Sequence, residues 1–224
     1  MNWSDNKLHE INMTNRNNSP YSATITGCAF LYNEFMRILP LLMDKNAEGL
    51  LKEEVLNNRI LQVNSQKARQ TFITEFKRRY RAVPATFWTN FANMNEAVQR
   101  AGLLYAILKA YKLVFDFHFN VTVKRWNSVD QTLHKNDIMM EFSELSSRDA
   151  FVDSWTEKTK DKCASQYLTI LRQAGLLQEK TDELQPLHLE ASDFEYYVRS
   201  GEDWFLEACL LYPYEVNNIK TQLS

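Results

Sequence analysis

The stretch from Asn95 to Phe119 limits the fold more than any other feature, because it carries apolar side chains on nearly every side of a helix. Its apolar residues are Leu103, Leu104, Tyr105, Ile107, Leu108, Tyr111, Val114, Phe115 and Phe117. A helix that is apolar all round must be covered by protein or by lipid. Lys109, Lys112 and Asp116 interrupt the run well short of the roughly 18 residues that a membrane span needs. The sequence therefore predicts a helix at the centre of a helical bundle, with no membrane contact.

Composition favours a mainly α-helical fold. The 224 residues include only 5 Gly and 5 Pro, too few for the many tight turns of a β-sandwich or barrel. A net charge of −2 excludes a global field that would draw the protein onto nucleic acid or anionic lipid, so either kind of binding requires a local patch. Cys28, Cys163 and Cys209 form no CxxC pair, and the polar N-terminus contains no apolar leader segment. Both observations favour a reducing, cytoplasmic location.

Apolar spacing predicts further helices on both sides of the central one. Residues 1–19 hold six asparagines and few apolar side chains, so we expect a disordered tail there. The predicted helices cover Cys28–Met43, which Pro40 would kink or end, Ala47–Leu56, Ser65–Ala82 and Asn136–Ser147. Residues 20–130 would form an N-terminal helical bundle around the central helix.

From residue 154 onward the chain has the order of a winged helix-turn-helix. The tetrapeptide Ser-Trp-Thr-Glu at 154–157 predicts a capping box, in which the Ser and Glu side chains bond two free backbone N–H groups. The helix would end at Ala174, with Gly175 in the left-handed conformation. Two short apolar runs around the polar turn Lys180–Glu183 predict a small β-hairpin. We expect residues 131–224 to form a winged-helix-like unit followed by C-terminal helices.

Catalytic signatures are missing from the sequence. It contains no Gly-rich phosphate loop, no HExxH, no GxSxG and no dinucleotide-binding fingerprint. Asp130 and His134 lack a third metal ligand, so a solvated surface explains them better. The spacing of Asp116 and His118 puts them on different sides of a helix, which favours a buried hydrogen-bonded pair over catalysis. The Glu75-Phe76-Lys77 spacing occurs in some metal nucleases, but there it lies on a strand. We therefore expect no enzymatic activity, no cofactor and no metal.

Charge is unevenly distributed along the chain. Between Arg59 and Arg81 seven basic residues stand against one acidic residue, whereas Glu179–Glu215 holds ten acidic residues against two basic ones. A basic helix could follow a phosphate backbone, each contact releasing a counterion. The contacts would then be made by Lys67, Arg69, Lys77, Arg78, Arg79 and Arg81. The equally supported alternative is a solvated helix face, paired with the acidic C-terminal part.

The predicted helix of residues 155–174 carries a second basic surface. Five polar side chains recur at helical spacing and share one face: Lys158, Lys162, Ser165, Thr169 and Arg172. Such a face suits the DNA major groove, where lysine reaches phosphates or guanine and hydroxyl groups reach base edges. We also assign Lys160 to this DNA-binding surface, and Lys180 to the neighbouring backbone, although Asp182 and Glu183 would be repelled by phosphate. The alternative is a helix-turn-helix used for packing or for a protein partner.

Eight short segments, in order over residues 20–212, carry a family resemblance. They are Tyr21-Ser22-Ala23, Thr26-Gly27, Leu31-Tyr32-Asn33-Glu34-Phe35, Leu39-Pro40-Leu41-Leu42, Val114-Phe115-Asp116-Phe117, Ser154-Trp155-Thr156-Glu157-Lys158-Thr159, Leu171-Arg172-Gln173-Ala174-Gly175-Leu176-Leu177 and Gly201-Glu202-Asp203-Trp204-Phe205-Leu206. Together they are similar to the BrxA family of BREX phage-defence systems. The resemblance implies a small all-helical cytoplasmic protein, similar in fold to the antitermination factor NusB. It also implies an accessory, DNA-binding role beside a methyltransferase and ATPase-type proteins, and it supplies no catalytic residues.

These observations predict a non-catalytic accessory protein that binds double-stranded DNA in a BREX phage-defence system. Two alternatives stay open. The exposed helix face could dock another defence component, as a protein–protein adaptor that never contacts nucleic acid. The basic helix could instead bind RNA, which only the likeness to NusB suggests. Whether the two basic helices share one face is a question that the sequence leaves to the structure.

Overall fold

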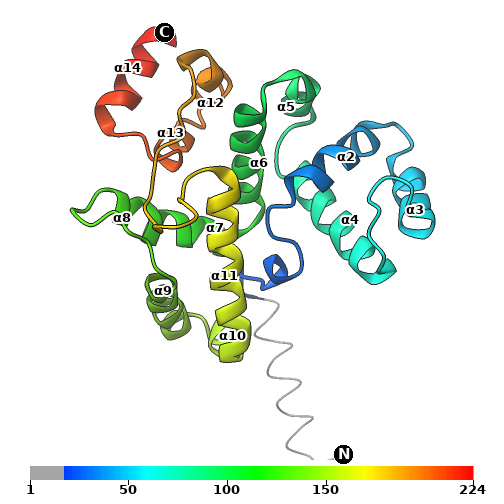
Figure 1. The fold of residues 1–224 in the computed structure, drawn as a ribbon, viewed down its shortest axis with the longest axis horizontal. Coiled ribbons are helices and arrows are strands. Elements are labelled where there is room, and N and C mark those ends of the chain that lie inside the picture. The colour runs from blue at the N-terminus through cyan, green and yellow to red at the C-terminus, as the bar shows by residue number, and fades with distance from the viewer. Residues whose placement is uncertain (1–17, 224) are drawn as a thin grey trace, which may run out of the picture.

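The structure, a computed structural model, describes residues 18–223 and is built mainly of helices (Figure 1). The longer helices are α2 (Tyr32–Met43), α3 (Ala47–Asn57), α4 (Gln66–Arg81), α6 (Glu96–Ala110), α9 (Lys135–Arg148), α11 (Glu157–Ala174) and α14 (Pro213–Leu223). The shorter segments are η1 (Thr24–Thr26), α5 (Ala85–Thr89), η2 (Phe91–Asn93), α7 (Lys112–Phe117), the π-helical η3 (His118–Val123), α8 (Lys124–Trp126), α10 (Ala150–Asp153), η4 (Ala191–Phe194), α12 (Glu195–Arg199) and α13 (Trp204–Ala208). The predicted mainly α-helical class is confirmed. The expected tail at 1–19 lies almost entirely outside the described residues, and the likeness to NusB stays a prediction.

Helix α6 forms the centre of the core, as its apolar sequence predicts. Every residue from Ala101 to Leu108 is buried, and both α4 and α11 pack against this helix. Gly102 permits the closest approach, because a Cβ atom at this position would lie only 2.5 Å from the ring of Phe91. Among the described residues, no helix combines the length and the apolar character required to cross a membrane.

The predicted helix over Asn95–Phe119 is wrong in one respect, since it breaks at Tyr111. The backbone there is extended (φ −130°, ψ 104°), so α6 ends at Ala110 and α7 begins one residue later. No Gly or Pro marks the break. Instead, the Tyr111 hydroxyl donates to Glu75 Oε2 (2.8 Å) and accepts from Arg79 Nε (3.3 Å). These buried contacts with α4 hold Tyr111 in place and give the break its physical basis.

Helix α2 differs from its prediction at both marked positions. It begins at Tyr32 rather than near Cys28, and it continues past Pro40 to Met43. Pro40 therefore does not end the helix. The Pro40 ring lies on the exposed side, while Phe35, Ile38 and other apolar residues of α2 are buried. Burial of this apolar face keeps the last turn helical despite the hydrogen bond that proline cannot donate.

The ends of α11 confirm one prediction and correct another. Gly175 adopts the expected left-handed conformation, with φ +91°. The N-terminal cap, however, is Thr156, whose hydroxyl accepts a hydrogen bond from the backbone N–H of Thr159 (3.2 Å). The Ser154 hydroxyl donates instead to the carbonyl of Phe151 (2.7 Å) within α10. The capping box predicted at 154–157 is therefore wrong, because the chain is still completing the preceding helical turn at Ser154.

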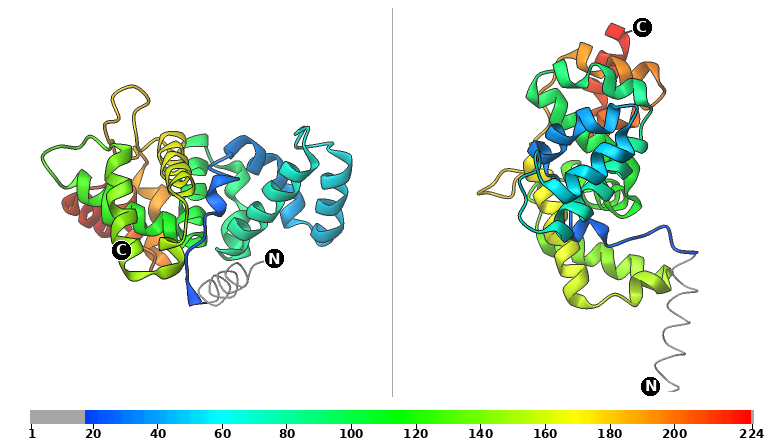
Figure 2. Two further views of the ribbon diagram at one scale, coloured as in Figure 1. Left: turned by 90° about the horizontal axis from the view of Figure 1, so that it is seen from below. Right: turned by 90° about the vertical axis from the view of Figure 1, so that its right-hand side faces the viewer.

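The predicted β-hairpin and winged-helix unit are not supported. Within residues 18–223 the backbone forms two isolated antiparallel bridges and no strand, pairing Leu177 with Leu184 and Thr132 with Glu183. The segment after α11 does fold back, with the Gln178 N–H donating to the Glu183 carbonyl (2.9 Å). Residues 182–184 pair with two neighbouring segments, residues 131–133 and residues 177–178, so neither pairing extends into a ladder. This segment is a turn without strands, and it protrudes on the side where α11 is exposed (Figure 2).

Core side chains from both sides of residue 130 pack together. The ring of Tyr105 contacts those of Tyr197 and Phe205, and the ring of Phe117 contacts that of Tyr167. These residues belong to one hydrophobic cluster. The division into units 20–130 and 131–224 stays a prediction.

Candidate nucleic-acid interface

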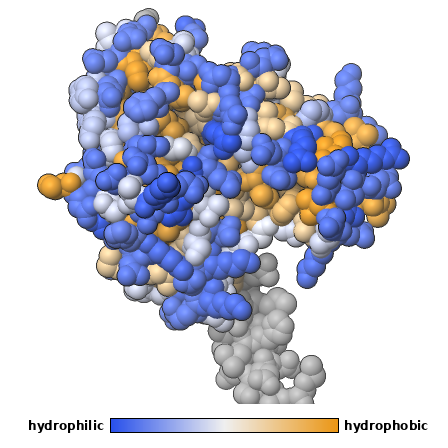
Figure 3. Space-filling model, viewed as in Figure 1, coloured by the Kyte–Doolittle hydropathy of each residue, from blue (hydrophilic) through white to orange (hydrophobic). Residues whose placement is uncertain are grey.

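The exposed face of α11 begins with two lysines one turn apart. Lys158 and Lys162 are both exposed, and neither forms an ion pair with another described residue. They lie in the N-terminal half of an 18-residue helix, and Lys158 belongs to its first turn, where the helix dipole favours bound anions. Hydrophilic residues predominate over α11 on this side of the molecule (Figure 3). This pair provides two cations that are available to a phosphate backbone.

Three carboxylates near α11 pair with basic residues other than Lys158 and Lys162. Asp161 pairs with Lys135, and Glu157 lies 3.5 Å from the ammonium of Lys160. On the following turn, Asp182 pairs with Arg172 at 2.5 Å. Among the described residues, no carboxylate therefore pairs with Lys158 or Lys162.

The C-terminal half of the predicted surface is engaged within the protein. Arg172 forms an ion pair with Asp182, and only a quarter of the Arg172 side chain is exposed. The hydroxyls of Ser165 and Thr169 are half-buried and donate to carbonyls one turn earlier, at 3.0 Å each. The turn itself carries Glu179 and Glu183, both exposed. The available positive charge of α11 is therefore at its N-terminal end.

Lys160 does not belong to this surface. Only 8% of the residue is exposed, because it lies on the buried side of α11 with Cys163 and Tyr167. Its assignment as a DNA contact is therefore corrected. The spacing of Lys160, Cys163, Ala164 and Tyr167, at i, i+3, i+4 and i+7, is the sequence signal for burial.

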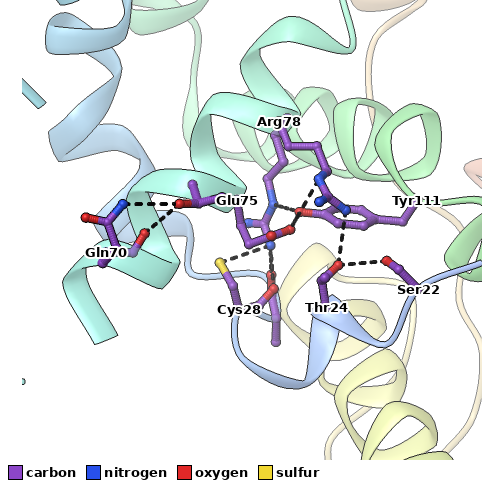
Figure 4. Close-up of polar contacts among 10 residues, drawn as sticks. Ser22, Thr24, Cys28, Gln70, Glu75, Arg78 and Tyr111 are labelled. Atoms are coloured by element: carbon purple, nitrogen blue, oxygen red, sulfur yellow. Dashed lines mark hydrogen bonds and ion pairs between the residues drawn. The ribbon is translucent and has the colours of Figure 1, made fainter. Parts of the chain in front are cut away.

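Arg79 is a structural residue rather than a DNA contact. Its guanidinium is completely buried and donates to the carbonyls of Cys28 (2.6 Å), Ala29 and Phe30 (2.7 Å), in addition to Tyr111. Figure 4 shows Cys28, Glu75 and Tyr111 gathered around this network. The prediction that Arg79 contacts a phosphate is corrected by this burial.

Arg69 is likewise removed from the candidate interface. It is 6% exposed, and its guanidinium donates to the carbonyls of Val55 (2.8 Å), Val63 (2.6 Å) and Asn64 (3.1 Å). These bonds fix the loop between α3 and α4. The prediction that Arg69 contacts a phosphate is therefore corrected too.

The remaining basic residues of α4 do not form one stripe. Lys67 is exposed near the N-terminal end and has no ion pair among the described residues. Lys77 and Arg81 both pair with Glu48 of α3, at 2.6 and 3.1 Å. Arg78 donates to Thr24 (3.2 Å), whose hydroxyl contacts that of Ser22, as Figure 4 shows.

Lys77, Arg78 and Arg81 instead line a hollow of about 660 Å³ between α3, α4 and the end of α6. No described residue of α11 lines it. The structure therefore brings these three α4 residues together, but it does not join them to the lysines of α11 in one site.

The acidic and histidine pairs considered for chemistry have separate structural partners. His118 is completely buried, with Nε2 2.8 Å from the Ala208 carbonyl and Nδ1 3.1 Å from the Tyr167 hydroxyl. Because a carbonyl only accepts, Nε2 carries the proton. Burial lowers the pKa of His118 to about 4. Asp116 accepts from Tyr21 (2.8 Å) and pairs with Lys112. Within residues 18–223 no three potential metal ligands are grouped.

Comparison with known proteins identifies the family. Residues 19–201 match the sequence model of the BrxA family. The "BREX protein BrxA" of Bacillus cereus (strain H3081.97) is 24% identical over 160 residues, covering 71% of this chain and 80% of that protein. The crystal structure of an uncharacterized protein from Magnetospirillum magneticum has the same fold. Its TM-score is 0.73 at 19% identity, covering 86% of this chain and 98% of that one. Since the family match extends over well more than half of the sequence, the chain belongs to the BrxA family.

Proposed function

We propose that this protein is a non-catalytic component of a BREX phage-defence system and that it binds double-stranded DNA through the exposed face of α11. The observation that carries the DNA-binding part is the pair of exposed lysines, Lys158 and Lys162, in the N-terminal half of this helix, which form no ion pair with any residue that the structure describes. The proposal that the protein is a component of a BREX system rests on the family and on the name of the Bacillus cereus relative. The cytoplasmic location, which the three free cysteines favour, is part of the same proposal.

Electrostatics supports phosphate contact at the N-terminal half of α11. Lys158 and Lys162 lie one turn apart, and Asp161 between them is neutralised by Lys135. The positive end of the helix dipole adds to the attraction for an anion. Each phosphate that a lysine neutralises releases a condensed counterion, which makes such binding strongly dependent on salt.

The turn after α11 contributes little on this view. It lacks the strands of a wing, and its exposed Glu179 and Glu183 repel phosphate. Arg172 would have to leave Asp182 before reaching DNA. We therefore assign the main contacts to the two lysines, and a secondary role to Arg172.

The direct test is fluorescence anisotropy of a labelled duplex of about 20 bp, titrated with protein at several salt concentrations. We expect the affinity to fall steeply with salt. The variant Lys158→Gln/Lys162→Gln should bind about tenfold more weakly, and its salt slope should be shallower by about two. The matched control, Lys45→Gln/Lys124→Gln, removes two exposed lysines that form no ion pair among the described residues and lie outside α11. It should retain the wild-type affinity and slope.

Three outcomes would reject the proposal. Absence of duplex binding even near about 50 mM salt would favour the adaptor function. Stronger competition by single-stranded RNA than by duplex DNA would favour RNA binding. An equal loss in both double variants would mean that net charge, and not the α11 face, governs binding.

A further inference from the structure

We propose that the hollow between α3, α4 and the end of α6 binds a nucleotide, a small ligand that carries both phosphate groups and an apolar base. The hollow measures about 660 Å³, which lies within the usual range for small-molecule sites, about 300–1,000 Å³. Its walls come from elements far apart in the sequence, so it is a feature of the fold. This site is separate from the DNA-binding face proposed for α11.

The wall of the hollow is strongly cationic. Lys52 of α3 and Lys77 and Arg81 of α4 face it together, and Glu48 is the one carboxylate among the described residues that line it. Arg78 lines it too, but its guanidinium lies 3.7 Å from the Glu75 carboxylate. Lys52 is exposed and forms no ion pair among the described residues. Lys109 also lines the hollow, but its ammonium pairs with Glu202. Several cations around one concavity provide the charge-assisted donors that phosphate oxygens accept.

The Glu48 carboxylate already binds two of the cations in the hollow with which a phosphate group would pair. It accepts from Lys77 (2.6 Å) and Arg81 (3.1 Å). The hydrogen bond from Lys77, followed by the charges of Lys77, Arg81 and Lys52, lowers the pKa of the Glu48 carboxyl. This side chain is 59% exposed, on the first turn of α3. It can therefore rotate into solvent when a phosphate group with more charge takes its place.

The floor of the hollow is apolar, which distinguishes a nucleotide from a bare phosphate. The half-buried Ala82 and Ala110 line it, together with the buried Leu51, Val55 and Ile73. Gln70 and Thr74, side by side at 3.5 Å, add polar groups at the same wall (Figure 4 shows Gln70). A base placed on the floor would cover apolar surface while its edge meets these polar groups, whereas inorganic phosphate would leave both unused.

Buried hydrogen bonds join the walls of the hollow to one another, and a preorganised site lowers the entropic cost of binding. Arg69 ties α4 to the carbonyls of Val55 and Val63. The buried Glu54 carboxylate accepts from the N–H groups of Ile60 (3.0 Å) and Leu61 (2.8 Å) in the same connection. The cations therefore meet the ligand from fixed helices. This concave arrangement favours a small ligand over a duplex, whose backbone requires an open stripe of contacts.

Isothermal titration calorimetry with ATP tests this inference on the full chain. We expect Lys77→Gln/Arg81→Gln to weaken ATP binding about tenfold or more, because two charge-assisted contacts are lost. Lys52→Gln should also weaken it, without breaking any ion pair among the described residues. Glu48→Gln should tighten it about threefold, since the competing carboxylate is removed. Adenosine and inorganic triphosphate, each lacking one half of the ligand, should both bind more weakly than ATP.

The Lys158→Gln/Lys162→Gln variant is the matched control, because it removes the same charge far from the hollow. It should keep its ATP affinity while losing duplex affinity, and Lys77→Gln/Arg81→Gln should do the opposite. Absence of heat with millimolar ATP would overturn the inference. So would triphosphate binding as tightly as ATP, weaker binding by Glu48→Gln, or a loss of duplex rather than ATP affinity in Lys77→Gln/Arg81→Gln. Because the DNA and ATP readouts are independent, failure of one proposal does not decide the other.

Discussion

Arg79 holds more of the structure together than any neighbouring charge. Its buried guanidinium joins α4 to the carbonyls of residues 28–30 and to Tyr111. Arg79→Met keeps most of the volume but leaves the buried carbonyls of residues 28–30 without their hydrogen-bond donor. We expect the free energy of unfolding to fall by about 3–5 kcal/mol. Urea unfolding followed by circular dichroism measures this change. Arg81→Met is the control, and a similar loss in that variant would contradict the argument.

The burial of Arg69 and Arg79 could have been predicted from helix spacing, although their charge suggested exposure. Arg69, Phe72, Phe76 and Arg79 follow i, i+3, i+7 and i+10, so they share one face of α4. What no local pattern contains is the identity of their partners. The carbonyls bound by Arg79 lie about fifty residues earlier. An arginine on an apolar helix face therefore indicates a buried hydrogen-bond donor rather than an exposed phosphate contact.

The π-helical segment η3 places an uncharged histidine where three elements meet. His118 contacts Tyr167 of α11 and the Ala208 carbonyl of α13. Burial lowers its pKa from 6.5 to about 4, so between these pH values the unfolded chain takes up a proton that the folded chain does not. Stability should therefore decrease as the pH falls through this window, by about 3 kcal/mol from this group.

The variant His118→Gln isolates this contribution from the titration of carboxylates. It should be less stable than the wild type near pH 7, because it loses the fitted hydrogen bonds. The difference should narrow as the pH approaches about 4, since only the wild type must bury a histidine that resists protonation. Urea unfolding at several pH values tests this expectation. A difference that stays constant with pH would refute it.

Among the helices, the apolar helix at the centre of the core could be predicted from the sequence, but the break within it could not. The core position of α6 follows from its sequence, because no face could be left in water. The break at Tyr111 depends on Glu75 and Arg79, which periodicity within Asn95–Phe119 does not contain. The cap at Thr156 rather than Ser154 depends on where α10 finishes. Contacts between distant parts of the chain therefore determine where a helix ends, whereas the local apolar pattern determines whether a helix forms.

For the whole molecule, the near-zero net charge conceals two separate cationic surfaces. One is the Lys158–Lys162 end of α11, and the other is the hollow lined by α3 and α4. The sequence predicted both basic segments but not their separation, because the fold determines which of them lies in a concavity. Arg69, Arg79 and Lys160 belong to neither, since they are buried.

The cooperativity of unfolding tests whether residues 20–130 and 131–224 share one core. The ring of Tyr105 in α6 contacts Tyr197 and Phe205, and Phe87 contacts Tyr196, so α12 and α13 share one core with α5 and α6. We expect a single thermal transition, with coincident curves from far-ultraviolet circular dichroism and tryptophan fluorescence. Phe205→Ala should shift both curves together, because removing this buried ring costs about 3–5 kcal/mol. Two separated transitions, only one of them shifted by Phe205→Ala, would instead mean that residues 20–130 and 131–224 fold as independent units.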